Sequence, residues 1–208
     1  MEELDLLKKS WQKSENSFEQ ISEKEIYKML HTKSSSIVKW ILVISILEVI
    51  FWSGISLLFN TDDYLLKHPE LITYFKILNY FNYIVILIFI VLFYRNYKSI
   101  STTVSTKQLM KDILKTRKTV HYYVYYNLGM IVIGMLAGFY IALTYNPEVI
   151  DFKEKITSNP KAMIITFGIF GLITIACVGL FWLFYRLLYG ILLRRLYNNY
   201  KELKKIDL

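Results

Sequence analysis

The chain has 208 residues, of which 54% are hydrophobic and 16% aromatic, and its formal net charge is +8 at pH 7. This composition is typical of a membrane protein and argues against a soluble domain of the same length. The single cysteine, Cys177, excludes an intramolecular disulfide, so packing between elements must hold the fold together.

The first 36 residues are predicted to form a polar, helical tail that precedes the membrane. Ser22 and Glu25 have the spacing of a capping box at a helix start, and Ile21 and Ile26 flank them as a hydrophobic staple. The helix that follows should loosen at residues 31–36, where three serines follow one another. An earlier short helix is predicted because apolar residues recur there at helical spacing.

Short helices of this kind are marginal in water, so the apolar faces of the tail need a covering surface. That surface is the rest of this chain, the membrane interface, or a cytoplasmic protein that binds residues 1–35. The residues expected to make the contact are Leu4, Leu7, Trp11, Ile26, Met29 and Leu30.

Four apolar stretches follow, at residues 37–59, 74–94, 122–145 and 162–185. Each approaches or exceeds the roughly 20 residues that cross bilayer hydrocarbon as a helix. The sequence therefore predicts an all-α, integral membrane four-helix bundle at residues 37–185, between a tail at 1–36 and a C-terminal helix extension at 186–208.

Two apolar stripes continue the third and fourth spans beyond the membrane. Leu109, Ile113 and Val120 precede the third span. A second stripe follows the fourth span and comprises Leu188, Leu192, Leu196, Tyr200 and Leu203. These stripes predict helix extensions that offer the tail a packing partner within the chain.

Basic residues indicate the orientation, because Lys and Arg concentrate in cytoplasmic loops. Twenty of the 25 lie in the N-terminal tail, the central loop and the C-terminal end, which predicts that both termini are cytoplasmic. Because these basic residues lie beside the spans, we expect them to bind anionic lipid headgroups rather than nucleic acid. Aromatic girdles are expected at the two interfaces: Tyr74, Phe75 and Tyr80 at one, and Tyr94, Tyr97, Tyr122, Tyr123, Tyr125 and Tyr126 at the other.

Glu48 is the outlier of the sequence, because an ionisable group in the middle of the first span is costly unless it is neutral or partnered. Asn82 and Thr174 are expected at a similar depth, with Asn79 nearer the outside and Asn127 nearer the inside. Three interpretations stay open. Glu48 is a protonated residue that fixes helix register, a proton or cation site, or one half of a charge pair with a partner subunit.

Gly134, Gly138 and Ala142 form a stripe of small residues in the third span. Such a stripe lets a second helix approach closely, either within the bundle or in a homodimer.

The three histidines, His31, His68 and His121, lack metal-ligand spacing. Neither a metal nor another cofactor is predicted, and no residue is predicted to be catalytic.

Three runs near the N-terminus carry a family resemblance: residues 6–12 (LLKKSWQ), 25–31 (EIYKMLH) and 34–42 (SSSIVKWIL). Over roughly the first 55 residues the chain resembles an uncharacterised bacterial family of four-span membrane proteins. The resemblance implies a location in the bacterial inner membrane. Some members of that family carry the label beta-carotene monooxygenase, an activity that uses a histidine-ligated iron, which three histidines split across the membrane would not supply.

Two functional hypotheses follow. The first is a non-enzymatic membrane protein with a regulatory or scaffolding role, whose cytoplasmic tail binds another protein. The alternative is a small transporter or proton-coupled component that uses Glu48.

Overall fold

The computed structural model describes residues 22–58, 69–145, 149, 152–153 and 158–206. Within these ranges the chain forms four long helices and no strand, as the sequence predicts. The helices are α2 (Glu23–Leu58), α4 (Pro69–Thr102), α5 (Thr106–Tyr145) and α7 (Pro160–Ile206). Each of them is long and apolar enough to cross a membrane.

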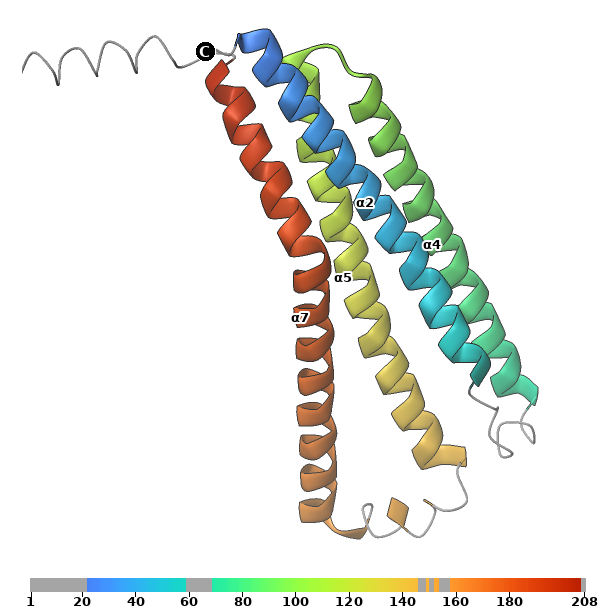
Figure 1. Ribbon diagram of the computed structural model, residues 1–208. Coiled ribbons are helices and arrows are strands. Elements are labelled where there is room, and N and C mark those ends of the chain that lie inside the picture. The colour runs from blue at the N-terminus through green and yellow to red at the C-terminus, as the bar shows by residue number, and fades with distance from the viewer. Residues whose placement is uncertain (1–21, 59–68, 146–148, 150–151, 154–157, 207–208) are drawn as a thin grey trace, which may run out of the picture.

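The four helices lie side by side, and consecutive helices run in opposite directions (Figure 1). Both α2 and α5 pack against α4 and α7, whereas the diagonal neighbours, α2 with α5 and α4 with α7, touch little. The start of α2 and the end of α7 therefore lie at the same end of the molecule. At the opposite end, α5 and α7 reach further than α2 and α4, so the two helix pairs are staggered along the long axis.

Side-chain caps fix two of the helix starts. The Ser22 amide donates to Glu25 Oε2 at 3.0 Å and the Glu25 amide donates to Ser22 Oγ at 3.3 Å, which confirms the predicted capping box. Its staple residue Ile21 lies outside the described residues. At α7, Asn159 Oδ1 accepts from the Lys161 amide at 3.0 Å, directly before Pro160.

Helix α2 runs unbroken through residues 31–36, so the expected loosening is wrong. The polar side chains of this segment find partners without disturbing the backbone. Thr32 Oγ1 donates to the Lys28 carbonyl at 2.9 Å, and buried Ser34 accepts from Asn199 Nδ2 of α7 at 3.0 Å. Because Leu30 and Val38 are also buried, tertiary packing outweighs the poor helix propensity of three serines. The boundary predicted at residue 36 is therefore the middle of a helix.

The residues predicted as extensions of the third and fourth spans are helical and belong to α5 and α7. Helix α4 extends past its predicted span too, ending at Thr102 rather than Tyr94, so the central connection shortens to residues 103–105. Apolar residues from all four helices fill the interior at this end, and we call this region the packed half. Its buried members are Leu30, Val38, Ile100, Leu109, Ile113, Leu196 and Leu203.

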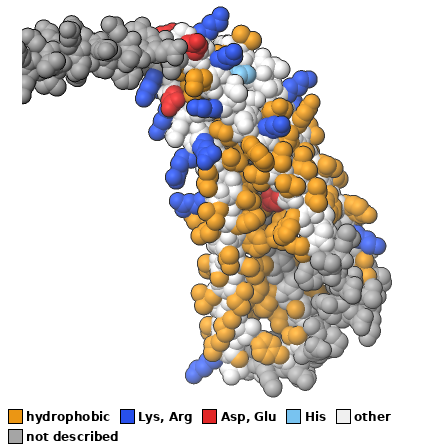
Figure 2. All heavy atoms as spheres, viewed as in Figure 1, with side chains coloured by type: hydrophobic (Ala, Val, Ile, Leu, Met, Phe, Trp, Pro, Cys, Tyr) orange, Lys and Arg blue, Asp and Glu red, His pale blue; other side chains and the backbone are white. Residues whose placement is uncertain are grey.

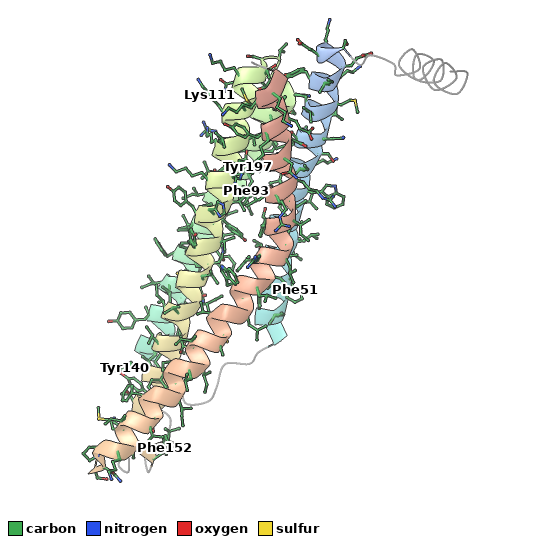
Figure 3. All side chains as sticks on the ribbon, turned by 90° about the vertical axis from the view of Figure 1, so that its left-hand side faces the viewer. Phe51, Phe93, Lys111, Tyr140, Phe152 and Tyr197 are labelled. Carbon is green, nitrogen blue, oxygen red and sulfur yellow. The ribbon has the colours of Figure 1, made fainter. Side chains whose placement is uncertain are left out.

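Apolar side chains cover much of the outer surface along the helices, whereas Lys and Arg gather at the end that holds the start of α2 (Figure 2). Phe51 and Tyr140 are exposed on the outside, while Phe93 is fully buried among the helices (Figure 3). A soluble monomer rarely exposes so large an apolar surface, so this distribution fits helices surrounded by lipid.

Candidate functional site

Glu48 lies among three tyrosine hydroxyls that come from two other helices. Tyr185 donates to Glu48 Oε1 at 2.6 Å, while Tyr189 and Tyr123 donate to Oε2 at 2.9 and 3.1 Å. The carboxyl group is buried, with 7% of the residue exposed. We call these four residues the Glu48 cluster. It joins α2 to both α5 and α7 through side-chain hydrogen bonds.

The helical repeat and aromatic packing hold the tyrosines in place. Tyr185 and Tyr189 are four residues apart on one face of α7, and their rings stack with centroids 6.2 Å apart. On α5, the Tyr123 ring makes edge contacts with Phe89 and Phe93 of α4, each with centroids 5.4 Å apart. These contacts direct the hydroxyls to one point, so the carboxyl group meets preformed donors.

Among the described residues, the side chains that hydrogen bond to Glu48 are all tyrosines, and none of these partners is a Lys, Arg or His. A carboxylate can accept about four hydrogen bonds, and three of these positions are occupied. The remaining acceptor position is on Oε1, which receives one hydroxyl where Oε2 receives two.

A small cavity of about 180 Å³ adjoins the cluster, and we call it the polar cavity. Helices α2, α4 and α5 line it with Glu48, Val49, Trp52, Ser53, Asn79, Asn82, Tyr83, Ile86, Tyr123 and Asn127. A second cavity of about 360 Å³ shares five of these residues and reaches α7; we call it the apolar cavity. Its other residues are Phe75, Leu78, Met130, Ile131, Gly134, Phe181 and Tyr185.

Asn79, Asn82 and Asn127, the amides that the sequence singles out, line the polar cavity together with Glu48. None of them hydrogen bonds to the carboxyl group. Asn82 Oδ1 accepts from Tyr126 at 2.9 Å, and Asn127 Nδ2 donates to the Tyr123 carbonyl at 2.8 Å. The amides are therefore walls of the cavity, and the tyrosines are the partners of the acid.

Thr174 was predicted at the depth of Glu48, and this is wrong. Its hydroxyl donates to the Phe170 carbonyl of its own helix at 2.9 Å, and it lines neither cavity. Tyr185 occupies the expected position instead, 11 residues further along α7, which is about 16 Å at 1.5 Å per residue. The prediction assumed that the middles of all four spans share one level, whereas the helix pairs are staggered (Figure 1).

The tyrosines of the cluster are the residues that the sequence interpretation missed. The sequence predicts an interfacial girdle that includes Tyr122, Tyr123, Tyr125 and Tyr126, but only part of this group faces outward. Tyr122 and Tyr125 are 54% and 64% exposed, whereas Tyr123 is 1% exposed. Helical spacing carried only part of the signal, because Tyr123 lies about 160° around the helix from Tyr125, whereas Tyr126 lies within about 60° of both Tyr122 and Tyr123. Tyr185 and Tyr189 share one face of α7, but i,i+4 spacing alone does not separate a buried pair from an interfacial one.

The small-residue stripe does not make the close helix contact expected within this chain. A Cβ atom built on Gly134 or Gly138 meets no heavy atom within 4 Å. Gly134 instead forms part of the wall of the apolar cavity. Ala142 is partly buried. Packing inside the monomer therefore does not explain the stripe, and the homodimer stays a prediction.

The tail candidates divide into three groups. Leu30 is 3% exposed and Ile26 packs against the same apolar cluster, so neither presents a free surface. Met29 is 49% exposed. Leu4, Leu7 and Trp11 lie outside the described residues. The described part of the tail thus follows the self-packing interpretation, because it forms the first turns of α2.

A second buried carboxyl, Asp112, lies in the packed half and was not singled out by its sequence. Ser99 Oγ and Thr103 Oγ1 donate to its Oδ2 at 2.8 and 3.2 Å, and Gln108 Nε2 donates to Oδ1 at 3.1 Å. These bonds tie α4, the short turn and the start of α5 together. Unlike Glu48, Asp112 adjoins neither the polar nor the apolar cavity.

Glu25 is the carboxyl group whose titration the cap controls. Hydrogen bonds from the Ser22 amide and the Ser22 hydroxyl lower its pKa, with a smaller contribution from Lys28.

Within the described ranges, no group of three or more His, Cys, Asp or Glu side chains is arranged to hold a metal ion.

Comparison with known proteins gives one match. No curated protein matches the chain. No solved structure matches it either. Residues 24–208 match a family over nearly all of the described structure, from the first turn of α2 onward. The chain therefore belongs to the family described as Domain of unknown function (DUF8845).

Proposed function

We propose that this protein is a membrane-embedded, proton-coupled component that binds an organic cation at Glu48. The observation that carries the proposal is the incomplete environment of this carboxyl group. Three tyrosine hydroxyls donate to it, none of its described hydrogen-bonding partners is basic, and the cavity that adjoins it is lined by no Lys, Arg or His among the described residues. Intramembrane acids are costly to keep and characteristically mark ion or proton pathways.

Exchange of a proton for a cation needs Glu48 in two states, a carboxylate and a protonated carboxyl group, and the tyrosines are compatible with both. In the carboxylate state, three O–H donors stabilise the charge in a low-dielectric surrounding. A cation in the polar cavity completes the neutralisation, and a proton on the carboxyl group does so in its absence. One positive charge therefore replaces another, and the net charge of the site stays the same across the exchange.

The proposed orientation has both termini and the packed half on the cytoplasmic side of a bacterial inner membrane. The gathering of Lys and Arg at that end supports it, because cytoplasmic flanks carry the excess of basic residues (Figure 2). In this orientation the residues that line the cavities, such as Ser53 and Asn79, lie on the outer side of Glu48.

Isothermal titration of the purified protein in detergent with tetramethylammonium chloride tests the proposal. We expect saturable binding at pH 8 that weakens as the pH falls, because protons and the cation compete for Glu48. The ionisable groups that face this carboxyl group are Tyr123 of α5 and Tyr185 and Tyr189 of α7, and Tyr83 of α4 lines the adjoining cavity. None of these four is a basic or carboxylic side chain, so we expect the acid itself to set the pH dependence.

Glu48→Gln is the decisive variant, because glutamine keeps the shape and an acceptor oxygen but has no charge. We expect it to abolish tetramethylammonium binding. The matched control is Asp112→Asn, which neutralises the other buried carboxyl group that accepts three side-chain hydrogen bonds. Binding that survives Glu48→Gln, or that Asp112→Asn removes to the same degree, would contradict the proposal.

The interaction tail remains a second proposal for residues 1–21, with Leu4, Leu7 and Trp11 as its contacts. The structure changes its test. Deleting residues 1–35 would remove Leu30 and Ser34 from the interior of the packed half, so a lost phenotype would not separate binding from folding. Deleting residues 1–21 leaves α2 and its cap intact. A partner recovered only with the longer protein would then support the tail as a binding segment.

A further inference from the structure

We infer that the ligand of the Glu48 site is a tertiary or quaternary ammonium compound that carries an aromatic or branched apolar group. This inference rests on the proposed function and specifies its ligand class. It follows from the way the two cavities join. The polar cavity receives the charged nitrogen beside Glu48, and the apolar cavity receives the substituent.

The Glu48 carboxylate has little hydrogen-bonding capacity left for a ligand. Three tyrosine hydroxyls leave about one acceptor position on the Glu48 carboxylate. A primary ammonium brings three N–H donors and a tertiary ammonium brings one, while a quaternary ammonium brings none. The carboxylate itself therefore suits a cation with few donors, which it neutralises by charge rather than by several hydrogen bonds.

Aromatic rings lie beside the Glu48 carboxylate. Trp52 and Tyr123 line the polar cavity with Glu48, and Trp52 is 5.7 Å from Phe181 between ring centroids. Quaternary ammonium groups are recognised by the faces of such rings, and the attraction is stronger where water is excluded. A carboxylate and aromatic rings together form the environment that a methylated ammonium group requires.

The polar and apolar cavities are continuous. Trp52, Asn79, Asn82, Ile86 and Asn127 line both, so a ligand held beside Glu48 can extend into the larger space. There it meets mainly apolar side chains from three helices, including Phe75 of α4, Met130 of α5 and Phe181 of α7. The volume of about 360 Å³ lies in the range of small-molecule sites. Among the residues described as lining either cavity, there is no Lys or Arg to repel a cation.

The test compares two probes by calorimetry at pH 8: tetramethylammonium, which fills only the polar cavity, and benzyltrimethylammonium, which adds a ring. Burying that ring should tighten binding by about tenfold or more. Gly134→Leu should lower the affinity for benzyltrimethylammonium more than the affinity for tetramethylammonium, and so remove most of this gain. Gly134 lines only the apolar cavity, and a Cβ atom there meets no heavy atom within 4 Å.

Gly138→Leu is the matched control, because it makes the same change one turn further along α5, with the same free space and outside both cavities. It should leave both probes unaffected. Equal affinities for the two probes, or equal effects of the two leucine variants, would overturn the inference while the proposed function stands. If neither probe binds in a manner that depends on Glu48, the proposed function itself fails.

Discussion

The two halves of the molecule use the same four helices in different ways. In the packed half, apolar side chains such as Ile113 and Leu196 fill the interior, and polar groups pair across helices, as in the Ser34–Asn199 bond. In the other half, which we call the hollow half, amides and aromatic rings line two joined cavities. Glu48 lies at the boundary. The packed half also has a hollow of about 440 Å³ beside Lys33 and Arg195, but the cavities that reach the buried Glu48 lie in the hollow half.

The largest expected effect is a difference in unfolding free energy when an isoleucine is replaced by alanine in each half. Ile113→Ala in the packed half removes a fully buried side chain and should lower the free energy of unfolding by about 2–5 kcal/mol. Ile131→Ala enlarges a cavity that already exists, so we expect less than about 1 kcal/mol. Thermal unfolding of both variants in detergent, followed by helical circular dichroism, measures the difference. Equal losses would show that the halves are packed alike.

An intermediate effect is expected at the boundary. Tyr189→Phe removes a hydroxyl that donates to Glu48 and should cost about 1–2 kcal/mol of unfolding free energy, because the buried acid loses a donor. Tyr125→Phe is the control, since this side chain is 64% exposed and should be nearly neutral. The same unfolding experiment applies. A Tyr189→Phe protein as stable as the control would mean that the acid does not depend on this donor.

The smallest effect is a local pH dependence at the start of α2. Because hydrogen bonds from Ser22 lower the Glu25 pKa in the folded protein, the cap is stabilised above the usual carboxyl pKa. That contribution is lost as the pH falls through the lowered pKa. Hydrogen exchange should therefore show the Ser22 amide losing protection in acid, after correction for the intrinsic rate.

Glu25→Gln provides the comparison for this experiment, because it keeps an acceptor for the Ser22 amide but does not titrate. Protection in this variant should be independent of pH over the same interval. A wild-type amide that behaves like the variant would show that the cap does not respond to protonation.

Much of the fold follows from composition and periodicity. Long apolar stretches predict the helices, the Ser22 and Glu25 spacing predicts the start of α2, and the stripe through Leu109 and Ile113 predicts the interior of α5. These features depend on residues close together in the chain, so the sequence displays them directly.

The site was only partly predictable, because it depends on how the helices are shifted along one another. Glu48 was recognisable alone, since a carboxyl group inside an apolar stretch is unusual. Its partners Tyr185 and Tyr189 were not, because a tyrosine near the end of a span also fits an interfacial girdle. The stagger of α5 and α7 decides between these roles, and packing over the whole length of the helices sets the stagger.

The position of Trp52 gives this protein an optical probe of its own. Its indole lines both cavities and contacts the Phe51 and Phe181 rings, with centroids 5.4 and 5.7 Å away. Trp40 is largely exposed, and Trp182 lies beneath the Arg186 guanidinium at 5.0 Å. The emission maximum of an indole shifts with the polarity of its surroundings. Filling or emptying the cavities should therefore shift the emission maximum of Trp52. Occupancy of the site can therefore be read from the unlabelled protein.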